Sequence, residues 1–438
     1  MQAAEKIQYM SKPAPKVRSE FDRFGLDETL VRGIRAAGFT NPRPIQTETI
    51  PAGLGGRDVL GLAQTGTGKT AAFALPLLHR ILQKRRKGPC VLVLAPTREL
   101  ANQIAEETRM LAKFTRVKMV TIYGGVSIRS QVDQLRRRPE IVVGCPGRVL
   151  DLLQQGILKF DFIESLVIDE ADHMFDMGFM PDIKKILSAL PRQRQNLLFS
   201  ATMPKEIRHL ADDLLHKPTV VELNSTAPVE TIDHGLVLIP ERRKRDLLDH
   251  VLRRDDCHSA IVFTRTKHRA KRLADQLSKA GHRAVGIQGN LSQAQRDRAM
   301  RGFRTRKYDI LVATDIVARG IDVSGVSHVI NFDVPNTPEA YTHRIGRTGR
   351  AELSGIACTF VTGEDHSWLR ATERMIGSKI PRKEIDGFEA ESEPRPERCS
   401  APRGGSRNQN RGDGRPGGKK WNRWGKSSGQ GRSRRRAS

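Results

Sequence analysis

Closely spaced cysteine pairs, an apolar stretch near the N-terminus and long apolar runs are all missing from this sequence of 438 residues. The five cysteines, Cys90, Cys145, Cys257, Cys358 and Cys399, form no C-x-x-C pair, so the sequence indicates neither a zinc site nor a disulfide framework. No run approaches the roughly 18 apolar residues of a membrane span, and the N-terminus lacks the apolar core of a signal peptide. We therefore expect a cytoplasmic protein with no membrane partner.

Acidic residues are in deficit, because 49 Asp and Glu face 75 Lys and Arg, for a formal net charge of +26. This excess favours a polyanionic partner. It is concentrated at the C-terminus, where residues 398–438 hold 13 Lys and Arg against the single acid Asp413. The same stretch holds Trp421 and Trp424 and is too poor in aliphatic residues to form a core. We expect a disordered tail that binds single-stranded nucleic acid, with a solvated solubility tail as the alternative.

Short β-rich runs alternate with longer helical patterns through most of the chain, which is typical of βαβ units around a parallel sheet. The rhythm occurs twice, so the sequence predicts two α/β domains in tandem, joined by a polar stretch that contains proline. The expected segments are a flexible N-terminal segment (1–20), domain 1 (21–223), a linker (224–234), domain 2 (235–380) and a disordered basic tail (381–438).

A phosphate-binding loop follows the strand-like run DVLGL. The sequence AQTGTGKT, Ala63 to Thr70, leads directly into an apolar helical pattern, as in a P-loop. Gly66 and Gly68 would let backbone N–H groups surround phosphates, Lys69 would reach the β and γ phosphates, and the Thr70 hydroxyl would bind Mg²⁺. Ala63 stands where the usual pattern has its first glycine, so this position departs from the P-loop pattern.

Adjacent acids end an apolar run in the sequence VIDEADHMFDMGF. An ionised carboxylate at the end of a buried strand requires a cation or several hydrogen bonds to compensate it. Alone, the pair Asp169 and Glu170 would more often be a helix cap or part of a solvated loop. Beside a P-loop, Asp169 can hold the Mg²⁺ and Glu170 can orient and deprotonate the attacking water.

Residues 169–172 spell DEAD, and from Phe21 to Ile380 the chain resembles the DEAD-box RNA helicases of superfamily 2. The other family motifs occur in the expected order: GFTNPRPIQ (38–46), PTREL (96–100), GG (124–125), CPGR (145–148), SAT (200–202), VFTRT (262–266), QAQR (293–296), ATDIVARGID (313–322) and HRIGRTGR (343–350). The IPRKEIDGF ending and short basic tail most resemble the bacterial RhlE-type subgroup.

This resemblance implies two tandem RecA-like domains, each a parallel sheet flanked by helices, and an RNA-dependent ATPase that uses ATP and Mg²⁺. It implies closure on RNA and local, non-processive separation of short duplexes or remodelling of RNA–protein complexes. The implied catalytic residues are Lys69, Asp169, Glu170, Arg347 and Arg350, with Thr70 and Asp169 at the metal. The implied ATP-binding residues are Phe21, Phe39, Gln46, Ala63, Gln64, Thr65, Gly66, Thr67, Gly68, Lys69, Thr70, Gly320 and Asp322.

Coupling and RNA residues also follow from the resemblance. Gln46 would bond adenine and Phe21 would stack on it; Ser200, Thr202 and His343 would couple the nucleotide site to closure. The implied contacts to the RNA backbone, which are largely independent of sequence, are Pro96, Thr97, Arg98, Gly125, Arg148, Thr264, Gly289 and Thr314. Cys145 and Gln288 depart from the Thr and His common at these places.

Partners and rival functions stay open at this point. Ribosomal precursors and RNA-decay proteins are candidate partners, and a monomer is expected. An ATP-gated RNA clamp that nucleates ribonucleoprotein assembly without unwinding is one alternative. The other alternative is a DNA helicase or DNA-dependent remodeller. Comparing the stimulation of ATPase activity by RNA and by DNA distinguishes it from an RNA helicase.

Overall fold

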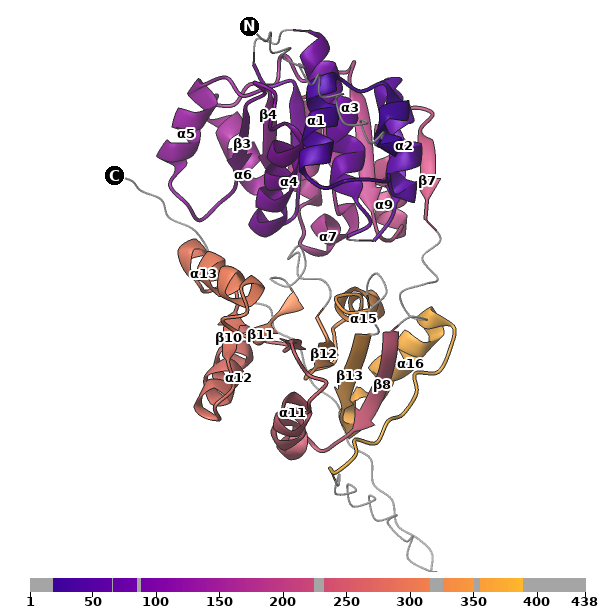
Figure 1. Ribbon diagram of the computed structural model, residues 1–438, viewed down its shortest axis with the longest axis vertical. Helices are drawn as coiled ribbons and strands as arrows, with labels where there is room; N and C mark the ends of the chain where they lie inside the picture. The colour runs from indigo at the N-terminus through magenta and orange to yellow at the C-terminus, as the bar shows by residue number, and fades with distance from the viewer. Residues whose placement is uncertain are drawn as a thin grey trace, which may run out of the picture. The chain divides into compact units, whose positions relative to one another are not determined.

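Two parallel sheets, each flanked by helices, make up the described part of the chain (Figure 1). The structure is a computed structural model that describes residues 19–64, 66–84, 88–223, 232–315, 326–349 and 355–388. Both sheets belong to one compact unit. The expected architecture of two tandem RecA-like domains is confirmed. Among the described residues, helices long and apolar enough to cross a membrane are absent.

The sheet of domain 1 has the strand order β3-β4-β2-β5-β6-β1-β7. Its strands are β1 (Val59–Leu62), β2 (Val91–Leu94), β3 (Met119–Ile122), β4 (Ile141–Gly144), β5 (Ser165–Ile168), β6 (Gln195–Ser200) and β7 (Thr219–Glu222). Its helices are η1 (Glu20–Phe24), α1 (Glu28–Ala36), α2 (Pro44–Leu54), α3 (Lys69–Gln83), α4 (Arg98–Leu111), α5 (Ile128–Arg136), α6 (Pro146–Gln154), α7 (Ala171–Asp176), α8 (Met180–Ser188) and α9 (Lys205–Leu214).

Helices cover both faces of this first sheet, which explains why its central strands are continuous apolar runs. One core contains residues of α1 to α4, and the other contains residues of α5 to α9. Every residue of β2, β4, β5 and β6 is buried. Because strands buried on both faces leave no alternating polar pattern, the runs read from the sequence coincide with these strands.

The sheet of domain 2 has the strand order β10-β11-β9-β12-β13-β8. Its strands are β8 (Ile232–Leu238), β9 (Ala260–Phe263), β10 (Ala284–Ile287), β11 (Ile310–Ala313), β12 (His328–Asn331) and β13 (Gly355–Val361). Its helices are η2 (Glu241–Arg243), α11 (Lys244–Leu252), α12 (Lys267–Lys279), α13 (Gln293–Arg304), α15 (Pro338–Ile345), η3 (Gly363–Asp365) and α16 (His366–Ile376). One core collects α13, α15 and α16, and the other collects α11 and α12.

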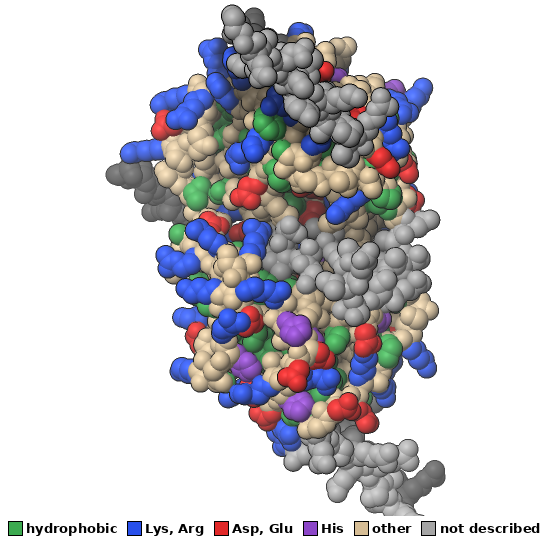
Figure 2. All heavy atoms as spheres, viewed as in Figure 1, with side chains coloured by type: hydrophobic (Ala, Val, Ile, Leu, Met, Phe, Trp, Pro, Cys, Tyr) green, Lys and Arg blue, Asp and Glu red, His purple; other side chains and the backbone are tan. Residues whose placement is uncertain are grey.

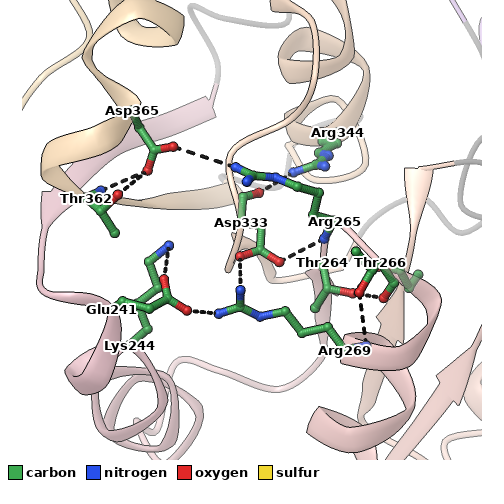
Figure 3. Close-up of polar contacts among 11 residues, drawn as sticks. Glu241, Lys244, Thr264, Arg265, Thr266, Arg269, Asp333, Arg344, Thr362 and Asp365 are labelled. Atoms are coloured by element: carbon green, nitrogen blue, oxygen red, sulfur yellow. Dashed lines mark hydrogen bonds and ion pairs between the residues drawn. The ribbon is translucent and has the colours of Figure 1, made fainter.

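A polar cluster fixes the start of α12 against the carboxyl ends of the second sheet's strands (Figure 3). The buried carboxylate of Asp333, after β12, accepts hydrogen bonds from the Arg265 backbone N–H at 2.8 Å and pairs with Arg269 at 3.0 Å. Arg269 also pairs with Glu241, which lies 3.2 Å from the buried Lys244 ammonium. Removing one partner would leave buried charges uncompensated, so this network holds the carboxyl ends of the strands against the neighbouring helices.

Residues 380–388 extend domain 2 beyond its expected end at residue 380. The Leu236 N–H donates to Pro381 O and the Lys383 N–H donates to Leu236 O, both at 2.8 Å, so this segment covers the free edge of β8. Ile380 is buried, and Phe388 packs against the ring of His250 on α11. The part of the expected tail from 381 to 388 is therefore part of domain 2, because it pairs with an edge strand that would otherwise be open. Residues 389–438 lie outside the described residues.

We expect this segment to stabilise domain 2. The free energy of unfolding of domain 2 should be about 2 kcal/mol lower in a chain that ends at Ile380 than in one that ends at Phe388. The shorter chain loses two backbone hydrogen bonds and the packing of Ile385 and Phe388. The measurement is urea denaturation followed by tryptophan fluorescence. Trp368 is then the only tryptophan, since the other two of the chain's three are Trp421 and Trp424, and it packs on Tyr341. Equal midpoints for the two truncated chains would contradict the assignment.

Candidate active site

Three neighbouring strands of domain 1 carry predicted catalytic and coupling residues to one edge. The P-loop follows β1, Ser200 ends β6 and Asp169 follows β5, and β6 lies between the other two in the sheet. Because all strands are parallel, their carboxyl ends lie at the same edge. The sequence motifs that are far apart in the chain therefore meet in space.

The P-loop residues form a phosphate cradle at the start of α3. Gly66 and Gly68 have φ angles of +84° and +94°, which side chains other than glycine rarely adopt. Gly68 is the N-cap of α3, and Thr67 donates from its hydroxyl to Gln64 O at 2.9 Å. Lys69, only 6% exposed, donates to Ala63 O at 2.9 Å. The helix N-terminus and the ammonium therefore face the same small volume, as an anion site requires. Thr65 lies outside the described residues.

Asp169 is buried beside this lysine. Its Oδ1 lies 3.8 Å from Lys69 Nζ and accepts the Glu170 N–H at 3.0 Å. Burial raises the pKa of Asp169 to about 6, although Lys69 opposes the shift. The local positive charge is thus too small to hold this carboxylate fully ionised, and a bound cation would remove the deficit.

Glu170 has the opposite electrostatic setting. Burial alone would raise its pKa, but the hydrogen bond from His173 and the charges of Lys69 and Arg347 outweigh burial, so the pKa is lowered. Glu170 is the N-cap of α7, with a φ of +53° that is uncommon for a residue other than glycine. The carboxylate therefore stays ionised and can accept hydrogen bonds.

The SAT residues contact the third acid of the DEAD sequence. Asp172 Oδ2 accepts hydrogen bonds from the backbone N–H and the hydroxyl of Thr202, both at 2.9 Å, and the Asp172 N–H donates to Ser200 Oγ at 3.2 Å. Ser200 is fully buried. The predicted coupling residues Ser200 and Thr202 are thus attached to the acidic segment itself.

The adenine-binding prediction meets a different geometry. Gln46 is fully buried; its Oε1 accepts the Arg43 N–H at 2.9 Å and its Nε2 donates to Gly68 O at 3.1 Å, so the amide already links α2 to the P-loop. Phe21 is fully buried, with its ring against the edges of Phe24 and Phe39. No face of Phe21 is exposed for a base, so the expected stacking finds no support here. Phe39, which is half-buried, is the better candidate.

In domain 2, motif HRIGRTGR lies at the end of α15. The buried Arg344 guanidinium binds the Asp315 carboxylate and donates to Asn331 Oδ1 at 3.1 Å, which fixes α15 on the sheet. Arg347 follows directly, and its charge lowers the pKa of Glu170. His343 lies in the same helix. The remaining predicted residues of this group, Gly320, Asp322 and Arg350, lie outside the described residues.

The predicted RNA contacts divide into two groups. The Arg98 guanidinium lies against Gly125, where a Cβ would come within 2.4 Å of its nitrogens. Arg148 keeps a buried guanidinium nitrogen that has no partner among the described residues. Thr264, in contrast, is fully buried with its hydroxyl toward Ala313 O and Thr266 O, so the expected phosphate contact of this hydroxyl finds no support.

The other predicted RNA residues differ in exposure. Pro96 and Thr97 are buried, and the Thr97 hydroxyl caps α4 by accepting the Leu100 N–H. Gly289 is exposed, and Thr314 is 8% exposed. Cys145 caps α6 without a side-chain hydrogen bond, and burial raises the pKa of its thiol to about 12, so the thiol stays protonated. An S–H group is a weaker hydrogen-bond donor than the threonine hydroxyl common at this place.

Three residues that join the two domains were not predicted from the sequence: Glu99, Gln293 and Arg296. Arg296 Nη2 of α13 pairs with Glu99 Oε1 of α4 at 2.9 Å, and Gln293 Oε1 accepts from Arg98 Nη1 at 3.3 Å. The signal was present, because these residues belong to the motifs PTREL and QAQR. Short strings do not reveal which motifs will contact each other.

The donor set fits a magnesium ion held together with a nucleotide. No group of three or more His, Cys, Asp or Glu side chains suited to a metal occurs among the described residues. Mg²⁺ needs no such cage, because it commonly binds one or two protein oxygens and takes its other ligands from phosphates and water. Thr70 and the buried Asp169 would supply those oxygens.

Comparisons with known proteins agree with this geometry. Residues 43–210 match the DEAD/DEAH box helicase family, and residues 243–352 match the helicase conserved C-terminal domain. The chain is 47% identical over 363 residues to the ATP-dependent RNA helicase CshA of Listeria monocytogenes, covering 83% of this chain and 70% of that protein. The chain belongs to the DEAD-box helicase family. The family resemblance expected from the motifs is confirmed.

A second relative and a solved structure show which DEAD-box proteins this chain resembles. The DEAD-box ATP-dependent RNA helicase CshA of Bacillus subtilis is 45% identical over 365 residues, covering 83% of this chain and 73% of that protein. The structure of S. cerevisiae Dbp5 bound to RNA and ADP BeF3 is similar with a TM-score of 0.74 and 32% identity, covering 83% of this chain and 96% of that chain. The CshA relatives give no support to the expected RhlE-type subgroup.

The raised pKa of Asp169 predicts a pH dependence of stability. The carboxyl is ionised above about 3.8 in the unfolded chain and above about 6 in the folded one, so stability is present at low pH and is lost as the pH rises through the folded value. In protein free of Mg²⁺ and nucleotide, the wild type should lose about 1 kcal/mol relative to Asp169→Asn between about pH 5 and about pH 7.5.

Urea denaturation followed by circular dichroism, at several pH values in the presence of a chelator, measures this difference. The exposed Asp161→Asn is the matched control and should follow the wild type at every pH. Parallel stability curves for the wild type and Asp169→Asn would contradict the raised pKa.

Proposed function

We propose that this chain is an ATP-dependent RNA helicase, which couples ATP binding and hydrolysis to closure on RNA. The observation that carries the proposal is the buried pair Asp169 and Glu170: Asp169 lies 3.8 Å from Lys69 of the P-loop, and Asp172 of the same DEAD sequence accepts hydrogen bonds from Thr202. The names of the CshA relatives and the RNA and ADP BeF3 bound to Dbp5 support RNA and ATP as its ligands.

The chemistry follows from the side chains at the carboxyl edge of domain 1. Lys69 neutralises the terminal phosphates, and the ionised Glu170 accepts a proton from the attacking water. Thr70 and Asp169 would hold Mg²⁺, which would supply charge neutralisation on the phosphates. Arg347 and Arg350 are the proposed arginine fingers, which stabilise negative charge at the γ-phosphate. ATP hydrolysis would then yield ADP and phosphate.

The nucleotide base and the RNA are the two ligands still to be placed. We propose that Phe39, with Gln46, contributes to the adenine site, since Phe21 is buried. Thr97, Arg98, Gly125, Arg148, Gly289 and Thr314 are the proposed contacts to the RNA backbone. Figure 2 shows Lys and Arg side chains over much of one face of the molecule, among them over α12 and α13. The exposed cations of these two helices include Lys267, Lys271, Arg298, Arg301 and Arg304.

Strand separation should be local and non-processive. A base-pair step is worth about 1.4 kcal/mol in DNA, so a duplex of ten pairs is held together by roughly 13 kcal/mol. One closure that bends a single strand can therefore separate only a short duplex. Remodelling of RNA–protein complexes uses the same closure. We propose the cytoplasm as its location, a monomer as its state, and ribosomal precursors or RNA-decay proteins as its partners. An RhlE-type subgroup rests only on the C-terminal ending and tail.

Steady-state ATPase activity tests the function directly. With Mg²⁺, single-stranded RNA should stimulate turnover and single-stranded DNA should not, and Glu170→Gln should lower kcat at least about 100-fold because it removes the proton acceptor. The exposed Glu106→Gln on α4 is the control with the same chemical change and should keep wild-type turnover. Equal stimulation by DNA would contradict the RNA specificity, and turnover unaffected by Glu170→Gln would contradict the site.

The basic tail should tether RNA without taking part in chemistry. Each single-strand phosphate that it neutralises adds about 0.7 to the slope of log affinity against log salt, so five contacts would cost roughly a hundredfold in affinity between about 50 and 200 mM salt. Deleting residues 398–438 should weaken RNA binding and flatten this slope while basal ATPase is unchanged. Fluorescence anisotropy of labelled RNA measures the slope, and an unchanged slope would rule the tail out as the tether.

A further inference from the structure

His173 is a buried residue that contacts the proton-accepting carboxylate. It lies in the first turn of α7 and is 5% exposed, and its Nδ1 is 3.3 Å from Glu170 Oε2. None of the roles described above uses this ring. Because both residues are buried and lie on the same short helix, their contact is part of the folded site and not a chance meeting of mobile surface groups.

The bonding pattern assigns the ring proton. An ionised carboxylate only accepts hydrogen bonds, so the Nδ1 atom must be the donor to Glu170. The Nε2 atom is buried and has no hydrogen-bond partner among the described residues. A buried N–H without an acceptor costs more than an unused lone pair on an aromatic nitrogen, so the proton is on Nδ1 and the Nε2 atom carries the lone pair.

His173 is also attached to the segment that carries the coupling contacts. Its backbone N–H donates to Asp172 Oδ1 at 3.0 Å, while Asp172 Oδ2 accepts both hydrogen bonds from Thr202. The ring therefore approaches Glu170 from a backbone position that the SAT contact holds. A change in the Asp172–Thr202 contact would move the donor that orients Glu170.

We infer that His173 is a positioning residue whose Nδ1–H holds the Glu170 carboxylate in the orientation that accepts a proton from water. The inference rests on the proposed ATPase function and deepens it. The left-handed backbone at Glu170 fixes where the side chain starts, and the hydrogen bond from His173 fixes where one of its oxygens ends. The other oxygen is then aimed by the same two restraints.

Two substitutions separate a donor role from a packing role. In His173→Asn the amide nitrogen takes nearly the place of Nδ1, although the side chain is much smaller. In His173→Gln the volume is closer to that of histidine, but the amide lies near the place of Nε2. A role as a hydrogen-bond donor therefore favours Asn, whereas a role as a space filler favours Gln.

The experiment measures RNA-stimulated ATPase activity of the full chain at saturating RNA, with kcat and the KM for ATP determined separately. We expect His173→Asn to keep kcat within about 3-fold of the wild type and His173→Gln to lower it about 10- to 100-fold, with KM unchanged in both, because only the orientation of Glu170 is altered. The exposed His209→Gln on α9 is the matched control and should leave kcat unchanged.

Two results overturn the inference alone: a His173→Gln turnover equal to or above that of His173→Asn, or wild-type kcat in both. A wild-type chain with no RNA-stimulated ATPase overturns the proposed function, and the inference with it. A second measurement uses only the wild-type chain, so it does not depend on whether the variants fold. Nitrogen NMR of the histidine rings in the wild-type chain should find His173 protonated at Nδ1, and protonation at Nε2 alone would overturn the inference.

Discussion

Two adjacent carboxylates buried at the end of β5 are the constraint on which the site depends. An ionised carboxylate in the interior is unstable unless cations or hydrogen bonds compensate it. Here the compensation is unequal, because Asp169 has Lys69 at 3.8 Å and a raised pKa, whereas Glu170 has the His173 hydrogen bond and a lowered pKa. Two neighbouring acids therefore differ in their electrostatic setting: Asp169 lacks positive charge that a cation would supply, whereas Glu170 is held ionised by its neighbours.

Parallel topology explains how a chain of this length assembles such a site. The P-loop, Asp169 and Ser200 come from three neighbouring strands whose carboxyl ends meet, so short motifs separated by many residues need no special loop to reach each other. The contacts Arg296–Glu99 and Gln293–Arg98 then link residues of the second domain to α4 of the first. Helix α4 of the first domain therefore carries both a contact to the second domain and Arg98, a proposed contact to the RNA.

Much of the fold was predictable from the sequence, because strands covered on both faces are apolar runs and because a P-loop combines glycine spacing, Lys69 and a helix in one string. What could not be predicted depends on packing between distant segments. The burial of Phe21 behind Phe39, the inward hydroxyl of Thr264 and the docking of Phe388 on α11 leave no local pattern. His173 was missed for the same reason, since its role depends on an atom that faces Glu170.

Strand separation on duplexes of different length shows whether ATP at this carboxylate site drives local opening of RNA. The full chain is mixed with Mg²⁺, ATP and a labelled RNA duplex of about 10 or about 40 base pairs, each with a single-stranded extension. We expect the short duplex to separate in an ATP-dependent way and the long one to persist, because one closure disrupts only a few base pairs. Efficient separation of the long duplex, or no separation of the short one, would contradict it.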